Sequence, residues 1–424
     1  MTAMTAVEPR STILDVFYGT ECIGSVHDTE PLAFAYTQTW LDRQGAFPLS
    51  SITLQVGRVT TPQVQAFFEN LLPEGEQRVY LAKQRKASTL FSLLLEVAGD
   101  TAGAFVMLPR GQTPQPPAYT PTTWEALART IQNQSAAAIQ MQGGHTRISL
   151  AGAQDKASIA IFDGSTPFLP QGLAPSTHIL KPDIRRLAKV RESAANEAIT
   201  MRTAAYCGLN TAKVFYQPQT RACVVERFDR VTRADGNLDR LVQYDFCQLT
   251  GTGSERKYEK EGGPGVAHCA QTIRQYSASA ALDLRAFAQW IFFNLYVGNN
   301  DSHAKNLSVY ERPGEGMRLT PFYDLMCTRI YPGLSREFAF NIGGTLLPGD
   351  IGKAQVQDLA VQIGMGAKYL QSVALELAAK VPDAIDLATQ DIAPNLGKGG
   401  QSFAEKLGMK VKSMTKRTAA RINA

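Results

Sequence analysis

The sequence is poor in cysteine and histidine, and neither residue type is spaced as a set of metal ligands. It has six cysteines and five histidines in 424 residues, and no two cysteines form a C-x-x-C pair. Disulfide scaffolds are usually shorter and denser in cysteine, and structural zinc sites need paired ligands. We therefore expect reduced thiols and no structural zinc site, as in a cytoplasmic protein.

Long apolar runs and a strong net charge are also lacking. The longest apolar stretches, such as residues 290–298, are far short of the ~20 residues that span a bilayer. The first ten residues lack the basic start and apolar run of a signal peptide. The net charge of +5 is too small to indicate a nucleic-acid binder. These absences predict a soluble intracellular enzyme without membrane contact.

Strand and helix patterns divide the chain into an N-terminal domain and a larger C-terminal region. The length suggests two or three domains. Residues 11–60 have the pattern of short strands, among them Ile52–Val56, and helical spacing follows from Thr61. Five prolines within Pro109–Thr123 favour an extended linker over a helix or strand. We place a domain boundary there.

The region after the linker is first mixed and then mainly helical. Strand-like segments at 146–150, 157–162, 177–181 and 222–227 surround a helical run at 192–207, and an apolar helix is predicted at 284–298. We predict an α+β fold with a small N-terminal α/β domain, a mixed-sheet lobe and a mainly helical lobe. The predicted segments are 1–110 (N-terminal domain), 111–144 (Pro-rich linker and connecting helix), 145–240 (sheet lobe), 241–397 (helical lobe) and 398–424 (basic tail).

The predicted tail carries the excess positive charge. Residues 398–424 contain seven Lys and Arg residues and one acidic residue. Such a patch could contact nucleic acid or an acidic partner. The alternative is a solvated helix face, which is the commoner case.

The strongest chemical signal is the segment from Asn299 to Asn306. Asp301 and Asn306 are five residues apart, the spacing of Asp and Asn in the protein-kinase catalytic loop H-R-D-x-x-x-x-N. There the Asp reaches the attacking hydroxyl as a base, and the Asn holds Mg²⁺ on the nucleotide phosphates. Asp and Asn are also common in polar loops. The position after an apolar helix favours the catalytic interpretation.

Two more charged positions fit a phosphate-handling enzyme. Asp324 lies 18 residues after Asn306 and could be a second metal-binding carboxylate. Lys181 ends a short strand, as the Lys of V-A-I-K does in kinases, and Glu197 or Glu192 could pair with it. Each of these residues alone is more often a solvated charge.

Two loops could contact a nucleotide. Residues 147–156 occupy the place of a glycine-rich loop but are not G-x-G-x-x-G. A P-loop NTPase is disfavoured because G-x-x-x-x-G-K-[ST] is absent from the sequence. Small residues can still bring backbone N–H groups close to phosphate oxygens, although an ordinary hairpin is the commoner case. Glu226–Arg230 follows an apolar strand and could be an adenine-binding hinge or a plain edge strand.

Taken together, these segments resemble the HipA family of bacterial serine/threonine kinases, the toxins of HipA–HipB toxin–antitoxin pairs. Phe67–Gly75 is similar to the FF-x-NLLPEG signature of the family's N-terminal domain. Six segments in the family's order are similar to motifs of its kinase domain: Ser149–Lys156, Thr177–Pro182, Glu226–Arg230, Gln243–Gln248, Asp301–Asn306 and Pro321–Asp324. The resemblance implies that the two predicted lobes are those of a kinase-like domain.

The resemblance also implies an ATP- and Mg²⁺-dependent protein kinase with roles for particular residues. Asp301 is then the catalytic base, and Asn306 and Asp324 hold Mg²⁺. Ser149 matches a serine that family members autophosphorylate, which predicts self-inactivation. The implied nucleotide site comprises Ala151, Gly152, Ala153, Gln154, Asp155 and Lys156 (phosphate loop), Lys181 (phosphates), Glu226, Arg227 and Phe228 (adenine hinge), and Gln243, His303, Ala304, Lys305, Asn306, Tyr323 and Asp324 (lining).

The partners that the resemblance implies are a HipB-like helix-turn-helix antitoxin, operator DNA reached through the antitoxin complex, and a protein substrate. That substrate is expected to be an aminoacyl-tRNA synthetase, of the glutamyl type, whose phosphorylation inhibits translation and arrests growth. Two alternatives stay open. One is a small-molecule kinase, and the other is a non-catalytic corepressor that binds a DNA-bound antitoxin.

Overall fold

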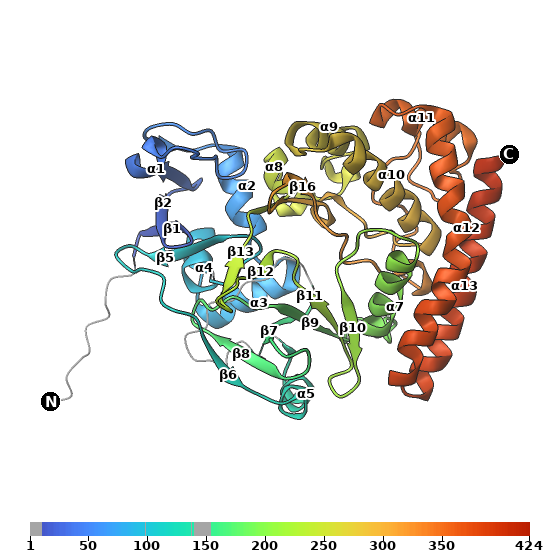
Figure 1. Cartoon of the computed structure of the whole chain (residues 1–424), viewed down its shortest axis with the longest axis horizontal. Coiled ribbons are helices and arrows are strands. Elements are labelled where there is room, and N and C mark those ends of the chain that lie inside the picture. Colours follow the sequence, from blue (N-terminus) through green and yellow to red (C-terminus); the bar gives the residue numbers. More distant parts are fainter. Residues whose placement is uncertain (1–10, 98, 137, 140–153) are drawn as a thin grey trace.

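An antiparallel sheet of five strands in the order β4-β3-β2-β1-β5 forms the N-terminal domain, at the left of Figure 1. The structure is a computed structural model and describes residues 11–97, 99–136, 138–139 and 154–424. Pro62 begins α2, and Phe68 on this helix packs on Phe34 of β3 with ring centroids 6.0 Å apart. The elements are β1 (Ile13–Tyr18), β2 (Glu21–His27), β3 (Ala33–Tyr36), α1 (Gln38–Asp42), β4 (Arg58–Val59), α2 (Pro62–Asn70), α3 (Gly75–Arg85), α4 (Leu90–Val97) and β5 (Phe105–Pro109).

The predicted strand over Ile52–Val56 is wrong. Ile52 forms only an isolated bridge with Leu49 and is buried, whereas Val56 is 77% exposed. The apolar residues of this segment therefore do not share one buried face. Gly57, with a φ of +91°, then turns the chain into β4.

A second antiparallel sheet, in the order β10-β11-β9-β7-β8-β6, forms the sheet lobe. Successive side chains of β11 point to opposite faces of the sheet, and both faces of this strand are apolar. Cys223 and Val225 join the core that contains α7, and Ala222 and Val224 join the core that contains Leu127 of α5. The elements are β6 (Ala118–Pro121), α5 (Trp124–Asn133), β7 (Ala157–Ile161), β8 (Pro167–Gln171), β9 (His178–Pro182), α7 (Ser193–Tyr206), β10 (Val214–Gln217) and β11 (Ala222–Glu226).

The prediction of an extended linker without a strand over Pro109–Thr123 is wrong in part, because β6 (Ala118–Pro121) lies within it. This strand pairs with β8 at the edge of the second sheet, with Ala118 opposite Gln171 and Pro121 opposite Phe168. Proline has no N–H group to donate and is tolerated on edge strands, so proline content alone did not exclude a strand here. Part of the segment assigned to the linker thus belongs to the sheet lobe.

The helical lobe is built around α10, which is buried along most of its length, as the apolar pattern predicts. It also carries a small three-stranded sheet, β14-β15-β16, and the two-stranded hairpin β12-β13 connects it along the chain to the sheet lobe. The elements are β12 (Arg230–Thr232), β13 (Leu238–Arg240), β14 (Gln243–Asp245), α8 (Phe246–Thr250), α9 (Val266–Tyr276), α10 (Ala280–Val297), β15 (Ser308–Arg312), β16 (Gly316–Leu319), α11 (Lys353–Ile363), α12 (Ala367–Ile392) and α13 (Lys398–Asn423). The predicted α+β class, with a small N-terminal domain, a sheet lobe and a mainly helical lobe, is confirmed.

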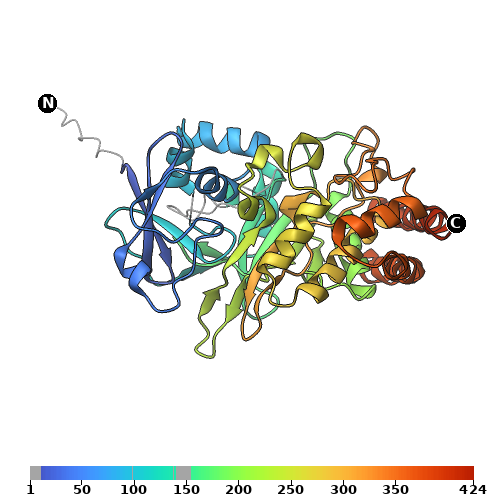
Figure 2. The same cartoon turned by 90° about the horizontal axis from the view of Figure 1, so that it is seen from above.

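The basic tail is an integral helix. Helix α13 lies beside α12 along one side of the molecule (Figures 1 and 2). Leu407, Val411 and Ile422 of α13 are fully buried in the main core, whereas Lys406 and Arg417 are exposed. The amphipathic pattern therefore folds one face of this segment into the lobe and leaves a basic face in solvent. Among the described residues, every helix is too short or too polar to cross a bilayer.

Candidate active site

A cleft of about 520 Å³ lies where the N-terminal domain, the sheet lobe and the helical lobe meet. Each of the three contributes side chains to its wall. The residues that line it include Glu74, Lys181, Phe228, Asp301, Asn306 and Asp324.

The loop that carries Asp301 begins where α10 ends. Gly298 terminates the helix in the left-handed conformation, with a φ of +70°. The Asn299 side chain donates to Asn294 Oδ1 on α10 at 2.8 Å, and the Asn300 N–H donates to Thr328 Oγ1 at 2.8 Å. These bonds anchor the loop to the buried helix and to the segment after Asp324.

The five-residue spacing of Asp301 and Asn306 closes the loop on itself. Asn306 Nδ2 donates to the backbone carbonyl of Asp301 at 3.0 Å. This bond leaves the Asn306 side-chain oxygen free to accept or to bind a cation. Asp301 is exposed at the mouth of the cleft, and Asn306 is buried in its wall.

Lys181 joins the two carboxylates that flank it. Its Nζ lies 2.6 Å from Glu197 Oε1 and 2.7 Å from Asp324 Oδ1. Glu197 is therefore the acidic partner, whereas Glu192 pairs with Arg221 at 2.9 Å. Burial alone would raise the pKa of Asp324, but the Lys181 charge outweighs it and holds that pKa well below its usual range.

Asp324 has a φ of +59°, which L-residues rarely adopt and which Asp and Asn tolerate best. The site therefore holds an anionic carboxylate on an unusual backbone beside Lys181.

Ala151, Gly152 and Ala153 of the predicted phosphate loop lie outside the described residues, and so do the predicted strand at 146–150 and the predicted autophosphorylation site Ser149. Of the described part, Gln154 and Lys156 line the cleft. Burial and the nearby Lys181 charge lower the pKa of Lys156 to about 8. Asp155 instead accepts the Ala136 N–H at 2.8 Å, so its carboxylate faces the α5 side.

At the predicted hinge two backbone N–H groups are already bonded. The N–H groups of Glu226 and Arg227 donate to the carbonyls of Lys213 and Thr177 at 2.9 and 2.8 Å. An adenine would therefore be bound by other groups of this segment. Phe228 offers an apolar surface, with its ring 5.6 Å from that of Tyr323.

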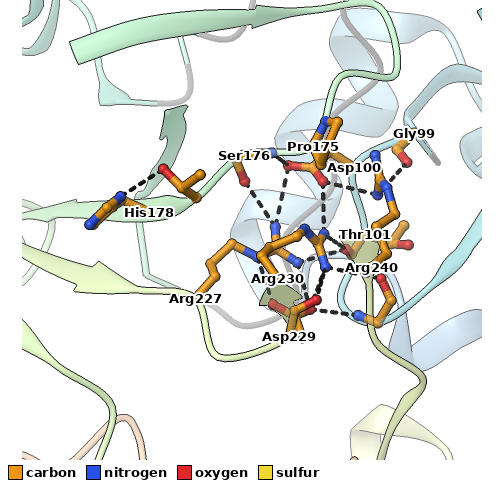
Figure 3. A network of polar contacts seen from close by, with 12 residues as sticks. Gly99, Asp100, Thr101, Pro175, Ser176, His178, Arg227, Asp229, Arg230 and Arg240 are labelled. Carbon is orange, nitrogen blue, oxygen red and sulfur yellow. Dashed lines mark hydrogen bonds and ion pairs between the residues drawn. The ribbon is translucent and has the colours of Figure 1, made fainter. Parts of the chain in front are cut away.

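The Arg227 side chain belongs to a buried ionic network between the hinge and the N-terminal domain (Figure 3). Asp100, which is fully buried, lies 3.2 Å from Arg227, 2.9 Å from Arg230 and 3.0 Å from Arg240. Asp229 completes the network at 2.8 Å from Arg227. The network fixes the hinge to the loop that precedes β5. Because the Arg227 side chain and N–H group are both bonded, its predicted contribution to a nucleotide site would come from its backbone carbonyl.

Other predicted lining residues divide into two groups. Gln243, His303 and Tyr323 line the cleft. The Tyr323 hydroxyl donates to the Lys305 carbonyl at 3.0 Å, and burial with the nearby Lys257 charge lowers the pKa of His303 to about 4. Ala304, in contrast, is fully buried in the main core, so its side chain does not reach a nucleotide.

The Lys305 ammonium points toward the N-terminal domain. It donates to Asn70 Oδ1 at 2.9 Å and pairs with Glu74 Oε1 at 2.8 Å. Lys257 pairs with the other Glu74 oxygen at 2.6 Å. Burial would raise the pKa of Glu74, but these two lysines lower it to about 2. The FF-x-NLLPEG segment therefore bonds directly to the catalytic loop.

Lys257 and Tyr258 are two residues of the cleft that the sequence did not predict. The Tyr258 hydroxyl donates to Asp301 Oδ1, and its ring lies edge-on to His303 with centroids 5.0 Å apart. The sequence feature that could have drawn attention to this segment is the polar run K-Y-E-K-E-G-G-P-G, whose paired glycines indicate a tight turn.

The residues of the cleft fit a magnesium nucleotide. Mg²⁺ in such sites is bound by one or two carboxylates with substrate phosphates rather than by a full protein cage. The side-chain oxygens of Asn306 and Asp324 in the cleft wall are of the type that could bind the metal, and Lys156 and Lys181 are cations that could contact phosphates. Among the residues that the structure describes, no group of three or more His, Cys, Asp or Glu side chains could hold a metal by itself.

Comparison with known proteins gives a consistent result. Residues 14–108 match the HipA N-terminal domain, and residues 148–385 match the HipA-like C-terminal domain. The chain is 34% identical over 397 residues to the putative kinase Y4mE of Sinorhizobium fredii, covering 89% of this chain and 92% of the relative. It is 30% identical over 394 residues to the serine/threonine-protein kinase toxin HipA of Shewanella oneidensis, covering 89% of both chains. A solved complex of HipA, HipB and operator DNA from Shewanella oneidensis MR-1 has a similar chain, with a TM-score of 0.82, 28% identity, and 95% and 97% coverage of the two chains.

Proposed function

Because the chain belongs to the HipA family of kinases, we propose that it is an ATP- and Mg²⁺-dependent serine/threonine protein kinase and the toxin of a type II toxin–antitoxin pair. The observation that carries this proposal is the convergence of Asp301, Asn306, Asp324 and Lys181 on one cleft. These four residues come from two lobes and from three separate segments.

Asp301 acts as the base. It takes the proton of the acceptor hydroxyl as the hydroxyl oxygen forms its bond to the γ-phosphorus, and the bond between that phosphorus and the β–γ bridging oxygen breaks to release ADP. Lys181, held between Glu197 and Asp324, binds phosphate oxygens. Asn306 and Asp324 would hold the metal, whose positive charge would neutralise the phosphates.

The protein substrate is an aminoacyl-tRNA synthetase, with the glutamyl enzyme as the first to test. The test incubates the purified protein with Mg²⁺, γ-labelled ATP and the synthetase, and measures label on the synthetase. Label on the synthetase with loss of tRNA charging supports the proposal. Transfer to small hydroxyl compounds but to no protein would favour a small-molecule kinase, and no transfer would favour a non-catalytic corepressor.

A HipB-like antitoxin that binds operator DNA is the proposed partner. The solved relative contains HipA, HipB and operator DNA together. The exposed basic face of α13 adds charge that could lie near DNA in such a complex, and phosphate contacts of this kind weaken steeply with salt. Because α13 is part of the core, point variants such as Arg417→Gln test this contact better than deletion of residues 398–424.

Asp324→Asn is expected to lower the affinity for ATP in Mg²⁺ by about tenfold or more, because a charged metal ligand is lost. Asn tolerates the left-handed backbone at this position, so the fold should be retained. Calorimetric titration with ATP, with and without Mg²⁺, measures the effect. An affinity equal to that of the wild type in Mg²⁺ would argue against Asp324 as a metal ligand.

Self-phosphorylation at Ser149 is expected to switch the enzyme off. A phosphate adds about −1.5 to −2 charges, which would repel the phosphates of ATP beside the loop that leads to Gln154 and Lys156. Incubation with Mg²⁺·ATP and phosphosite mapping by mass spectrometry tests this. A Ser149-phosphorylated protein that binds ATP normally would rule the switch out, and so would the absence of phosphate at Ser149.

A further inference from the structure

The carboxylate of Asp301 is exposed and has few restraints of its own. Its backbone is fixed, since the Asp301 N–H donates to Asn299 Oδ1 at 3.2 Å and its carbonyl accepts from Asn306. Among the described residues, the carboxylate itself has one hydrogen-bond partner, the Tyr258 hydroxyl. Without that bond the side chain could rotate among its rotamers in solvent.

Tyr258 is held by a loop that is fixed by three polar contacts. The loop comprises residues 254–265, and its Ser254 donates to Glu69 Oε1 of the N-terminal domain at 2.8 Å. Lys257, next to Tyr258, pairs with Glu74 of the same domain. In the helical lobe, Glu259 accepts the Asn341 N–H at 2.7 Å.

The glycine pair of the loop closes it tightly around Tyr258. The Gly263 N–H donates to the Tyr258 carbonyl at 3.0 Å. A Cβ on Gly263 would lie 2.0 Å from the Arg256 carbonyl oxygen and 2.8 Å from that of Tyr258, so only glycine fits. The phenol therefore projects from a rigid turn.

We infer that Tyr258 is a positioning residue for the base Asp301, and that Glu74 of the N-terminal domain holds the loop that presents it. This inference rests on the proposed kinase function. By donating to Oδ1, Tyr258 fixes the carboxylate and leaves Oδ2 for the acceptor hydroxyl. Such alignment matters because proton abstraction needs the base within hydrogen-bond reach of the acceptor.

The phenol is suited to be a permanent donor. Burial and the Asp301 charge raise the pKa of Tyr258 well above its usual value, so the hydroxyl stays protonated. Its ring packs edge-on against His303, which limits its movement.

Tyr258→Phe tests the inference because it removes the hydroxyl and keeps the ring. We expect kcat for phosphorylation of the synthetase to fall by about tenfold to a hundredfold, with KM for ATP, KM for the acceptor and the unfolding midpoint unchanged. Tyr369→Phe, at an exposed position on α12, is the matched control and should keep wild-type kinetics. Glu74→Gln should also lower kcat, because it weakens the ion pair with Lys257 that holds the loop.

The outcomes separate this inference from the proposed function. A wild-type protein without kinase activity would refute the proposed function itself. With an active wild type, an unchanged kcat in Tyr258→Phe overturns the positioning role, and so does a change confined to the acceptor KM or a loss of ATP binding. An unchanged kcat in Glu74→Gln overturns the part assigned to the N-terminal domain.

Discussion

Asp301→Asn is expected to lower the rate of phosphoryl transfer by about a hundredfold to ten-thousandfold, the range that a general base contributes. The amide cannot accept the proton of the acceptor hydroxyl, yet it keeps the size of the carboxylate and can still accept from Tyr258. Affinity for ATP should stay close to that of the wild type because Lys181, Asn306 and Asp324 are untouched. Transfer assays and calorimetric titration with Mg²⁺·ATP measure the two quantities.

The matched control for this variant is Asp358→Asn, at an exposed position on α11 far along the chain from the catalytic loop. It should leave both the rate and the affinity unchanged. Kinase activity of Asp301→Asn at the wild-type level would refute the assignment of the base, and a parallel loss of ATP affinity would indicate a role in binding instead.

Asp100→Asn is expected to destabilise the protein by about 3–5 kcal/mol, the usual cost of removing one member of a buried ionic group. Three arginines converge on this carboxylate, and Arg240 has no other carboxylate partner among the described residues. Urea unfolding of the variant and the wild type at pH 7 measures the loss. ATP affinity should fall as well, since the network fixes the hinge.

The same carboxylate gives the stability a pH dependence. Burial would raise the pKa of Asp100, but the three arginines lower it to about 2, below the value of about 4 expected in the unfolded chain. Its contribution is therefore complete above pH ~4 and is lost as the pH falls toward 2. The wild type should lose stability over this range more than the Asp100→Asn variant does.

Asp235→Asn provides the control for Asp100→Asn. Asp235 also pairs with an arginine, Arg233, at 3.3 Å, but both side chains are about half exposed on the β12–β13 hairpin. Exposed pairs of this kind contribute little to stability, so Asp235→Asn should destabilise the protein far less than Asp100→Asn does. Equal destabilisation by the two variants would show that the buried network has no special importance.

The sequence predicted the parts of the site that local spacing determines. The interval between Asp301 and Asn306 reflects a loop closed by one hydrogen bond between them, so it could be recognised without a structure. Lys181 stood at the end of a strand and Glu197 on the following helix, and the structure brings the two within 2.6 Å. The choice between Glu197 and Glu192 needed the structure, because both lie close to the start of α7.

The contacts between segments that are far apart in the chain could not be predicted from the sequence. Glu74 and Lys305 are more than two hundred residues apart, and neither has a neighbour in the sequence that indicates the other. Tyr258 was missed because a tyrosine in a polar run is usually a surface residue, and only the fold places it on Asp301. Basic composition likewise made α13 resemble a tail, although its apolar residues recur at helical intervals and are buried.

The positions of Asp100 and Glu74 predict what happens when the N-terminal domain is removed from the protein. A kinase domain separated from residues 11–109 would keep Arg240 and Lys305 in its interior but would lose the carboxylate that each now contacts. Both cations would have to turn outward to water, which would distort the hinge and the catalytic loop that hold them. We therefore expect the two family domains to fold together, so that a protein without residues 11–109 should be insoluble rather than an unregulated kinase.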